Sequence, residues 1–114
     1  MKQMLALAPL LALAGCLSHS APSPATYRAL GTEPFWGLLI DPNTITFTAP
    51  DAAPVIQRTP PVINGFAGAI YQTPRINVNI VRNQRCSDGM SDRVYPDKVQ
   101  VTVDGRRFEG CGGH

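Results

Sequence analysis

Apolar and polar residues alternate with a period of two along three parts of the chain, residues 43–48, 75–80 and 98–103. This period is typical of β-strands with one buried face, and β-branched side chains fill most of the apolar positions here. Eight prolines between residues 34 and 96 interrupt the chain too often for long helices. The pattern therefore predicts an all-β fold, a small antiparallel barrel or sandwich of about seven to eight strands.

Two short polar segments mark chain reversals between predicted strands. Asp41-Pro42-Asn43 separates an apolar run, residues 35–40, from the strand that follows it. Asp104-Gly105 favours a two-residue type I′ hairpin, because these residue types tolerate the positive φ that both positions require. In such a hairpin Val101 lies opposite Phe108, and both side chains point to the buried face.

The N-terminal segment has the features of a lipoprotein signal peptide. Lys2 precedes an apolar run over residues 4–14, which is shorter than the ~20 residues of a membrane-spanning helix. The run ends in Leu13-Ala14-Gly15-Cys16, which resembles the bacterial lipobox. This resemblance implies lipid attachment to Cys16 and cleavage before it. In a Gram-negative host an aspartate after the cysteine would favour the inner membrane, so Leu17 at that position implies an outer-membrane lipoprotein facing the periplasm. An ordinary secretory signal peptide is the alternative.

Composition divides the chain into three parts. We expect residues 1–15 to be the signal peptide, residues 16–26 to be the lipidated cysteine and a flexible Ser/Pro/Ala-rich tether, and residues 27–114 to form a single β domain. Ten Lys and Arg against eight Asp and Glu give a net charge of +2, without a basic cluster. We therefore expect no nucleic-acid partner; the expected partners are the membrane, through the lipid on Cys16, and an envelope protein.

The two remaining cysteines predict a disulfide. Once Cys16 carries lipid, Cys86 and Cys111 are an even pair in an oxidising compartment, where disulfides form and persist. The hairpin register places Cys111 opposite Lys98 and away from the buried face, so we expect the disulfide on the rim or the outer surface. A metal site of Cys86, Cys111 and His114 is the alternative, but we expect no metal and no cofactor.

Two segments resemble a family of small bacterial envelope lipoproteins. The first, Gly31-Thr32-Glu33-Pro34-Phe35-Trp36, fits an N/T-E-P-x-W motif. The second begins at Cys86, passes through Tyr95-Pro96 and ends at Gly110-Cys111-Gly112, and it fits C-x-D-x-M-S-x-x-x-Y-P…G-C-G. The resemblance covers roughly residues 27–113. It implies a small β-barrel, similar to META-type domains and to membrane-bound inhibitors of c-type lysozyme, but it implies no particular activity.

Large apolar residues and one polar loop supply the candidate functional positions. Phe35, Trp36 and Met90 are the candidate core anchors, since such side chains in a small barrel are mostly buried. Residues 87–96 are the candidate binding loop, compact because Cys86 pins its start and Pro96 its exit. Either Met90 and Tyr95 pack inward and the loop plugs the barrel end, or the loop is displayed for binding. Its candidate binding residues are Asp88, Ser91, Asp92, Arg93 and Tyr95.

These residues favour a protein without catalytic activity. Serine needs a positioned base, and the predicted domain has no internal histidine, so we assign no catalytic residue. We expect a structural or protein-binding module of the cell envelope. The alternatives are an inhibitor of a lysozyme-like hydrolase, which a projecting loop on a filled barrel would favour, and a small-ligand carrier, which an apolar pocket would favour. A carboxylate pair of the glycosidase type stays open among Glu33, Asp88, Asp92 and Asp97.

Overall fold

The computed structural model describes residues 26–114, so the predicted signal peptide, Cys16 and the rest of the tether up to residue 25 lie outside the described residues. In this part of the chain no helix is long and apolar enough to cross a membrane. The secondary structure of residues 26–114 consists of eleven strands: β1 (Tyr27–Thr32), β2 (Phe35–Ile40), β3 (Thr44–Thr48), β4 (Val55–Arg58), β5 (Ile63–Asn64), β6 (Gly68–Gln72), β7 (Ile76–Val81), β8 (Cys86–Ser87), β9 (Val94–Tyr95), β10 (Asp97–Val103) and β11 (Arg106–Gly113).

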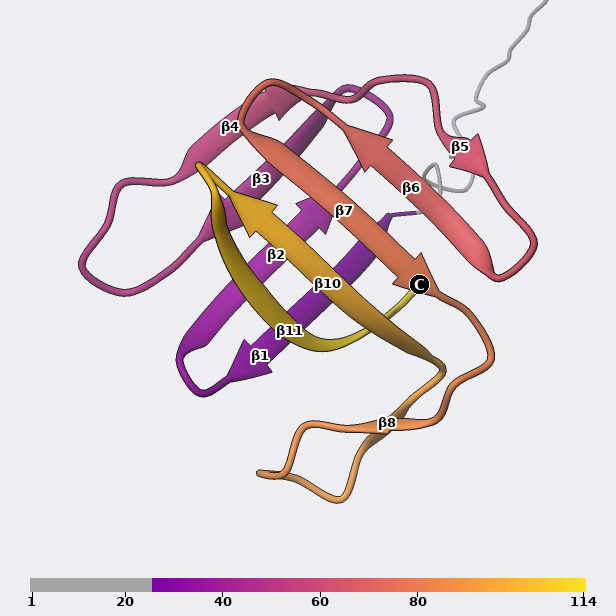
Figure 1. The fold of residues 1–114 in the computed structure, drawn as a ribbon. Helices are drawn as coiled ribbons and strands as arrows, with labels where there is room; N and C mark the ends of the chain where they lie inside the picture. The colour runs from indigo at the N-terminus through magenta and orange to yellow at the C-terminus, as the bar shows by residue number, and fades with distance from the viewer. Residues whose placement is uncertain (1–25) are drawn as a thin grey trace, which may run out of the picture.

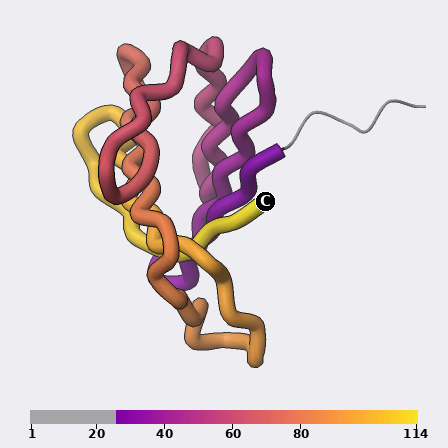
Figure 2. The backbone as a smooth tube through the Cα atoms, turned by 90° about the vertical axis from the view of Figure 1, so that its right-hand side faces the viewer, coloured from indigo at the N-terminus to yellow at the C-terminus, as the bar shows by residue number. Residues whose placement is uncertain are grey.

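Nine of these strands form one antiparallel sheet in the order β4-β3-β2-β1-β11-β10-β7-β6-β5, and β8 pairs with β9 separately. The large sheet curls into a half-barrel with two facing layers, one containing β1 to β4 and the other β6, β7 and β10 (Figures 1 and 2). The long, curved β11 joins them, since it pairs with β10 along its length and with β1 near its end. The all-β antiparallel prediction is confirmed, and eight of the eleven strands have four or more residues.

The space between the layers is filled by the side chains that the alternation assigned to buried positions. Each of them is worth about 1.5–3 kcal/mol when it is fully withdrawn from water. Aromatic rings fill one end of this core, where the centroids of Phe47 and Phe108 are 4.8 Å apart and those of Trp36 and Phe47 are 6.0 Å apart. The buried members of the three alternating segments are Ile45, Phe47, Ile76, Val78, Ile80, Val99, Val101 and Val103.

Both predicted reversals are confirmed. Asp104 and Gly105 have φ of 49° and 85°, as a type I′ hairpin requires, and Val101 pairs with Phe108. In the other turn Asp41 Oδ1 accepts hydrogen bonds from the backbone N–H groups of Asn43 (2.7 Å) and Thr44 (2.8 Å). These two bonds also lower the pKa of Asp41, because they stabilise its charged form.

The predicted core anchors in β2 have opposite outcomes. Trp36 is buried, with 5% of its surface exposed, which confirms the prediction, whereas Phe35 is 54% exposed and the prediction for it is wrong. Successive side chains in a strand point to opposite faces of the sheet, so two neighbours in β2 cannot both enter the same core. Because Trp36 faces inward together with Leu38 and Ile40, Phe35 faces outward.

Candidate functional site

The two sequence motifs meet around the indole of Trp36. Its ring lies over glycines of both motifs: a Cβ on Gly31 would come within 2.7 Å of Trp36 Cε2, and one on Gly110 within 2.8 Å of Trp36 Cζ2. Trp36 Nε1–H donates a hydrogen bond of 3.3 Å to the carbonyl of Glu109. Glycine is therefore needed at both positions so that β1, β2 and β11 can close on the ring.

The second motif also forms the β8–β9 hairpin, whose base is attached to the outer face of the sheet. Cys86 pairs with Tyr95 inside the hairpin, and its sulfur is bonded to Cys111 of β11, with a Cα–Cα distance of 5.5 Å. Cys111 pairs with Lys98, on the face opposite to the apolar core, so the predicted disulfide and its position outside the core are confirmed, although Cys111 itself is only 1% exposed. The hydroxyl of Thr32 donates a hydrogen bond of 3.0 Å to the carbonyl of Asp88, which attaches the hairpin to the first motif.

The tip of the hairpin is organised by the carboxylate of Asp88. Its Oδ1 accepts hydrogen bonds from the backbone N–H groups of Met90 (2.8 Å) and Ser91 (2.9 Å), and its Oδ2 accepts one from the Ser91 hydroxyl (3.1 Å). The pKa of Asp88 is lowered, first by the Met90 N–H and then by the Ser91 N–H, because both stabilise the carboxylate. Ser91 Oγ in turn accepts from the backbone N–H of Arg93 at 3.2 Å. The loop is thus compact, and its predicted polar residues lie together.

The side chains of this tip point into solvent. Ser91, Asp92 and Arg93 are exposed, and the Arg93 guanidinium carbon lies 5.0 Å from the centroid of the half-buried Tyr95 ring. Met90 is 68% exposed, so its prediction as a core anchor is wrong. The hairpin that carries Met90 projects away from the half-barrel instead of packing into it (Figures 1 and 2).

A shallow hollow of about 270 Å³ lies beside the base of the hairpin, and both motifs line it. Its charged residues are Glu33, Asp88, Lys98 and Glu109. Asp97 and Asp92, two of the four acidic residues considered as a catalytic pair, do not line it.

Asp97 instead belongs to a buried pair at another place in the fold. The Tyr27 hydroxyl donates a hydrogen bond of 2.7 Å to Asp97 Oδ2, across 70 residues of sequence. Burial, and then this hydrogen bond, raises the pKa of Tyr27 far above its ordinary value. The sequence contained no local signal for this pair, because the two residues come from strands at opposite ends of the domain sequence.

The alternative metal site is contradicted by the geometry. Cys86 and Cys111 are bonded to each other and have no free thiolate, and His114 packs edge-on against Tyr27 with 5.1 Å between ring centroids. Among residues 26–114 no three His, Cys, Asp or Glu side chains are grouped so that they could hold a metal ion.

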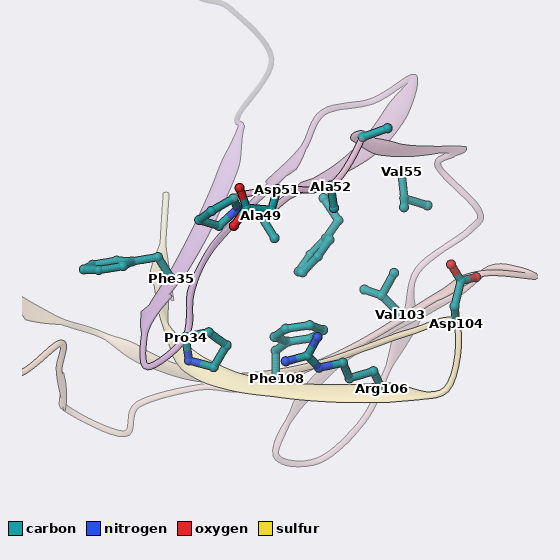
Figure 3. A pocket seen from close by; sticks show the side chains of 13 residues that line it. Pro34, Phe35, Ala49, Asp51, Ala52, Val55, Val103, Asp104, Arg106 and Phe108 are labelled. Atoms are coloured by element: carbon teal, nitrogen blue, oxygen red, sulfur yellow. The ribbon is translucent and has the colours of Figure 1, made fainter.

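The structure also contains an apolar cleft that the sequence had not revealed. It has a volume of about 500 Å³ and lies at one end of the half-barrel, where the β3–β4 loop faces the β10–β11 hairpin (Figure 3). Its lining comes from three separate parts of the sequence, residues 34–35, 47–55 and 103–108. Comparisons of the chain with family models, with curated proteins and with solved structures found no match.

Proposed function

We propose that this chain is a lipid-anchored, protein-binding module of the bacterial cell envelope, without catalytic activity, and that its β8–β9 hairpin is the binding element. The observation that carries the proposal is the projection of a short, internally braced hairpin from a half-barrel whose interior is filled. The lipobox-like segment ending at Cys16 supports the anchor and a position at the outer membrane, facing the periplasm.

The chemistry of the tip suits a protein partner. Met90 is 68% exposed, and in the same hairpin the guanidinium carbon of Arg93 lies 5.0 Å from the centroid of the Tyr95 ring. Methionine, arginine and tyrosine are enriched in protein interfaces because they offer large contact areas with adaptable polar groups. The hydrogen bonds to Asp88 and the disulfide to Cys111 hold the tip in one conformation, so that binding costs less conformational entropy.

A pair of matched double variants tests the proposal. Met90→Ala with Arg93→Ala removes exposed side chains from the tip but keeps every backbone hydrogen bond of the loop. Ile56→Ala with Arg58→Ala removes the same two classes of side chain from the edge strand β4, where Ile56 is 57% exposed and Arg58 is exposed. Each lipidated protein is used to capture partners from envelope extracts. We expect the wild type and the β4 variant to retain the same partner and the hairpin variant to lose it; retention by the hairpin variant would refute the proposal.

Inhibition of a lysozyme-like hydrolase is a second candidate function, and the projection of the hairpin favours it. A narrow loop can enter a concave active site, whereas the broad faces of the half-barrel cannot. We expect an inhibitor to lower the glycan-hydrolysing activity of such an enzyme when wild-type protein is added, and the Met90→Ala/Arg93→Ala variant to lose this effect. Undiminished activity with excess wild-type protein would exclude this candidate.

A further inference from the structure

The apolar cleft at the end of the half-barrel has the dimensions of a ligand site, and none of its lining residues belongs to the β8–β9 hairpin. Its volume of about 500 Å³ lies within the roughly 300–1,000 Å³ of small-molecule pockets. Phe47, Val55, Val103 and Phe108 form its floor. They keep 5–9% of their surface exposed, whereas the centre of the core, at Ile45 and Val78, is fully closed at 0%. The cleft therefore opens directly onto the apolar core.

The floor of the cleft is held in place before any ligand arrives. The rings of Phe47 and Phe108 contact each other, with centroids 4.8 Å apart, and Trp36 stacks behind Phe47 at 6.0 Å with an interplanar angle of 22°. Figure 3 shows the ring of Phe35 turned away from this space, so the aromatic part of the floor comes from the buried rings. A preformed apolar floor favours binding because little order has to be imposed on it.

One positive charge at this cleft has no acidic partner among the described residues. Asp104, in the β10–β11 hairpin, forms a salt bridge with Arg75, whose guanidinium donates hydrogen bonds of 2.9 and 2.7 Å to the two carboxylate oxygens. Arg106 forms no salt bridge within residues 26–114; its guanidinium carbon instead lies 5.0 Å from the centroid of the Phe108 ring. Asp51, the other charged residue of the lining, lies on the opposite rim (Figure 3). An anion is therefore attracted to the Arg106 side of the cleft.

We propose that this cleft binds a small amphipathic carboxylate, with its apolar part against Phe47 and Phe108 and its carboxylate on the guanidinium of Arg106. Arginine matches a carboxylate with two parallel N–H donors. The stacked position of Arg106 on Phe108 places this charge directly over the apolar floor. The site is separate from the β8–β9 hairpin, so the two can be disabled independently.

Decanoate is the probe for this site, and decanol is its uncharged counterpart. The binding assay uses the full chain with Cys16→Ser, so that no lipid is attached at this position. Trp36 is the single tryptophan of the chain and stacks on the cleft floor, so its fluorescence reports occupancy. We expect decanoate to change this fluorescence saturably and decanol to bind at least tenfold more weakly, the ratio that a charged hydrogen bond supplies.

Neighbouring arginines of β11 provide a matched pair of variants. Arg106→Gln removes the positive charge at the cleft. Arg107→Gln removes a positive charge outside the cleft, where the Arg107 guanidinium donates a hydrogen bond of 3.0 Å to Gln100. We expect Arg106→Gln to weaken decanoate binding at least tenfold and leave decanol unchanged, and Arg107→Gln to change neither. Ala52→Phe, which adds a ring to the lining, should weaken both ligands. Absence of saturable decanoate binding, or equal effects of the two arginine variants, would overturn the proposal.

Discussion

Phe35 and Trp36 are neighbours in sequence, yet β2 turns their side chains to opposite faces of the sheet. Residue type alone predicted both as core anchors, since both are large and aromatic. Trp36, Leu38 and Ile40 alternate along β2, which indicates that they share the buried face. Leu39 makes the other face of the strand apolar as well, so the sequence alone does not distinguish the two faces. Trp36 was predictable from its size, whereas the outward position of Phe35 depended on which face of β2 the second layer covers.

The first prediction compares these two residues. Trp36→Ala removes a buried ring and its hydrogen bond to the Glu109 carbonyl, and we expect it to lower the free energy of unfolding by about 3–5 kcal/mol. Phe35→Ala removes a ring that is 54% exposed, and we expect a loss below about 1 kcal/mol. Urea denaturation measures both. Equal losses in the two variants would contradict the assigned faces of β2.

At the scale of elements, the hairpins show what local sequence determines. Asp104-Gly105 and the turn at Asp41 were predicted correctly because a few adjacent residues decide their backbone conformation. The compact tip at residues 87–96 was also predictable, since Asp88 and Ser91 bond within the loop itself. The direction in which the hairpin extends was not, and Met90 was misassigned for that reason: local bonds do not specify whether a loop packs inward or projects.

The second prediction concerns the pH dependence of the hairpin tip. The native pKa of Asp88 lies below the ordinary value of 3.8, because the N–H groups of Met90 and Ser91 stabilise the carboxylate. Because the pKa of Asp88 is lowered in the folded protein, its carboxylate stabilises the hairpin tip fully above pH 3.8. This stabilisation is lost as the pH falls through the native pKa. We expect the amide resonances of Met90 and Ser91 to stay nearly unchanged from about pH 7 to pH 5 and to shift at lower pH with a midpoint below 3.8.

Two results test whether protonation of the Asp88 carboxylate causes this acid-induced shift. In Asp88→Asn the amide oxygen still accepts the backbone bonds but does not titrate, so the acid-induced shift of the two amides should disappear. A shift whose midpoint lies above 3.8 in the wild type would contradict the role assigned to the carboxylate.

The third prediction concerns the disulfide that attaches the hairpin. The Cys86–Cys111 bond closes a loop with a sequence separation of 25, and its loss is expected to cost about 2–4 kcal/mol. For a domain of this size, such a loss lowers the melting temperature by roughly 8–30 °C. Cys86→Ala with Cys111→Ala tests this in a thermal melt. Melting the wild type with reductant should lower the melting temperature as the double substitution does. A melting temperature that neither the substitutions nor the reductant changes would contradict the prediction.

At the scale of the whole molecule, the curl of the sheet decides which distant residues meet. Strand alternation predicted the buried faces, but it contains no information about the order β4-β3-β2-β1-β11-β10-β7-β6-β5. The apolar cleft depends on that order, because Phe47 and Phe108 come from strands that are not neighbours in the sheet. The Tyr27–Asp97 pair has the same origin. Such sites follow from tertiary arrangement and could not be predicted from periodicity.

The fourth prediction joins the fold to the proposed membrane anchor. The ten residues from Leu17 to Thr26 span at most about 35 Å, so lipid on Cys16 would hold the half-barrel close to the membrane surface. Two or more acyl chains anchor a protein stably, whereas a chain without lipid is released. We expect the intact mass of the wild type to correspond to a chain that begins at Cys16 and carries acyl groups, and Cys16→Ser to move to the soluble fraction. Cys86→Ser is the control, since it alters a cysteine of the β domain and should remain with the membrane. A wild-type mass without lipid, or membrane retention of Cys16→Ser, would contradict the anchor.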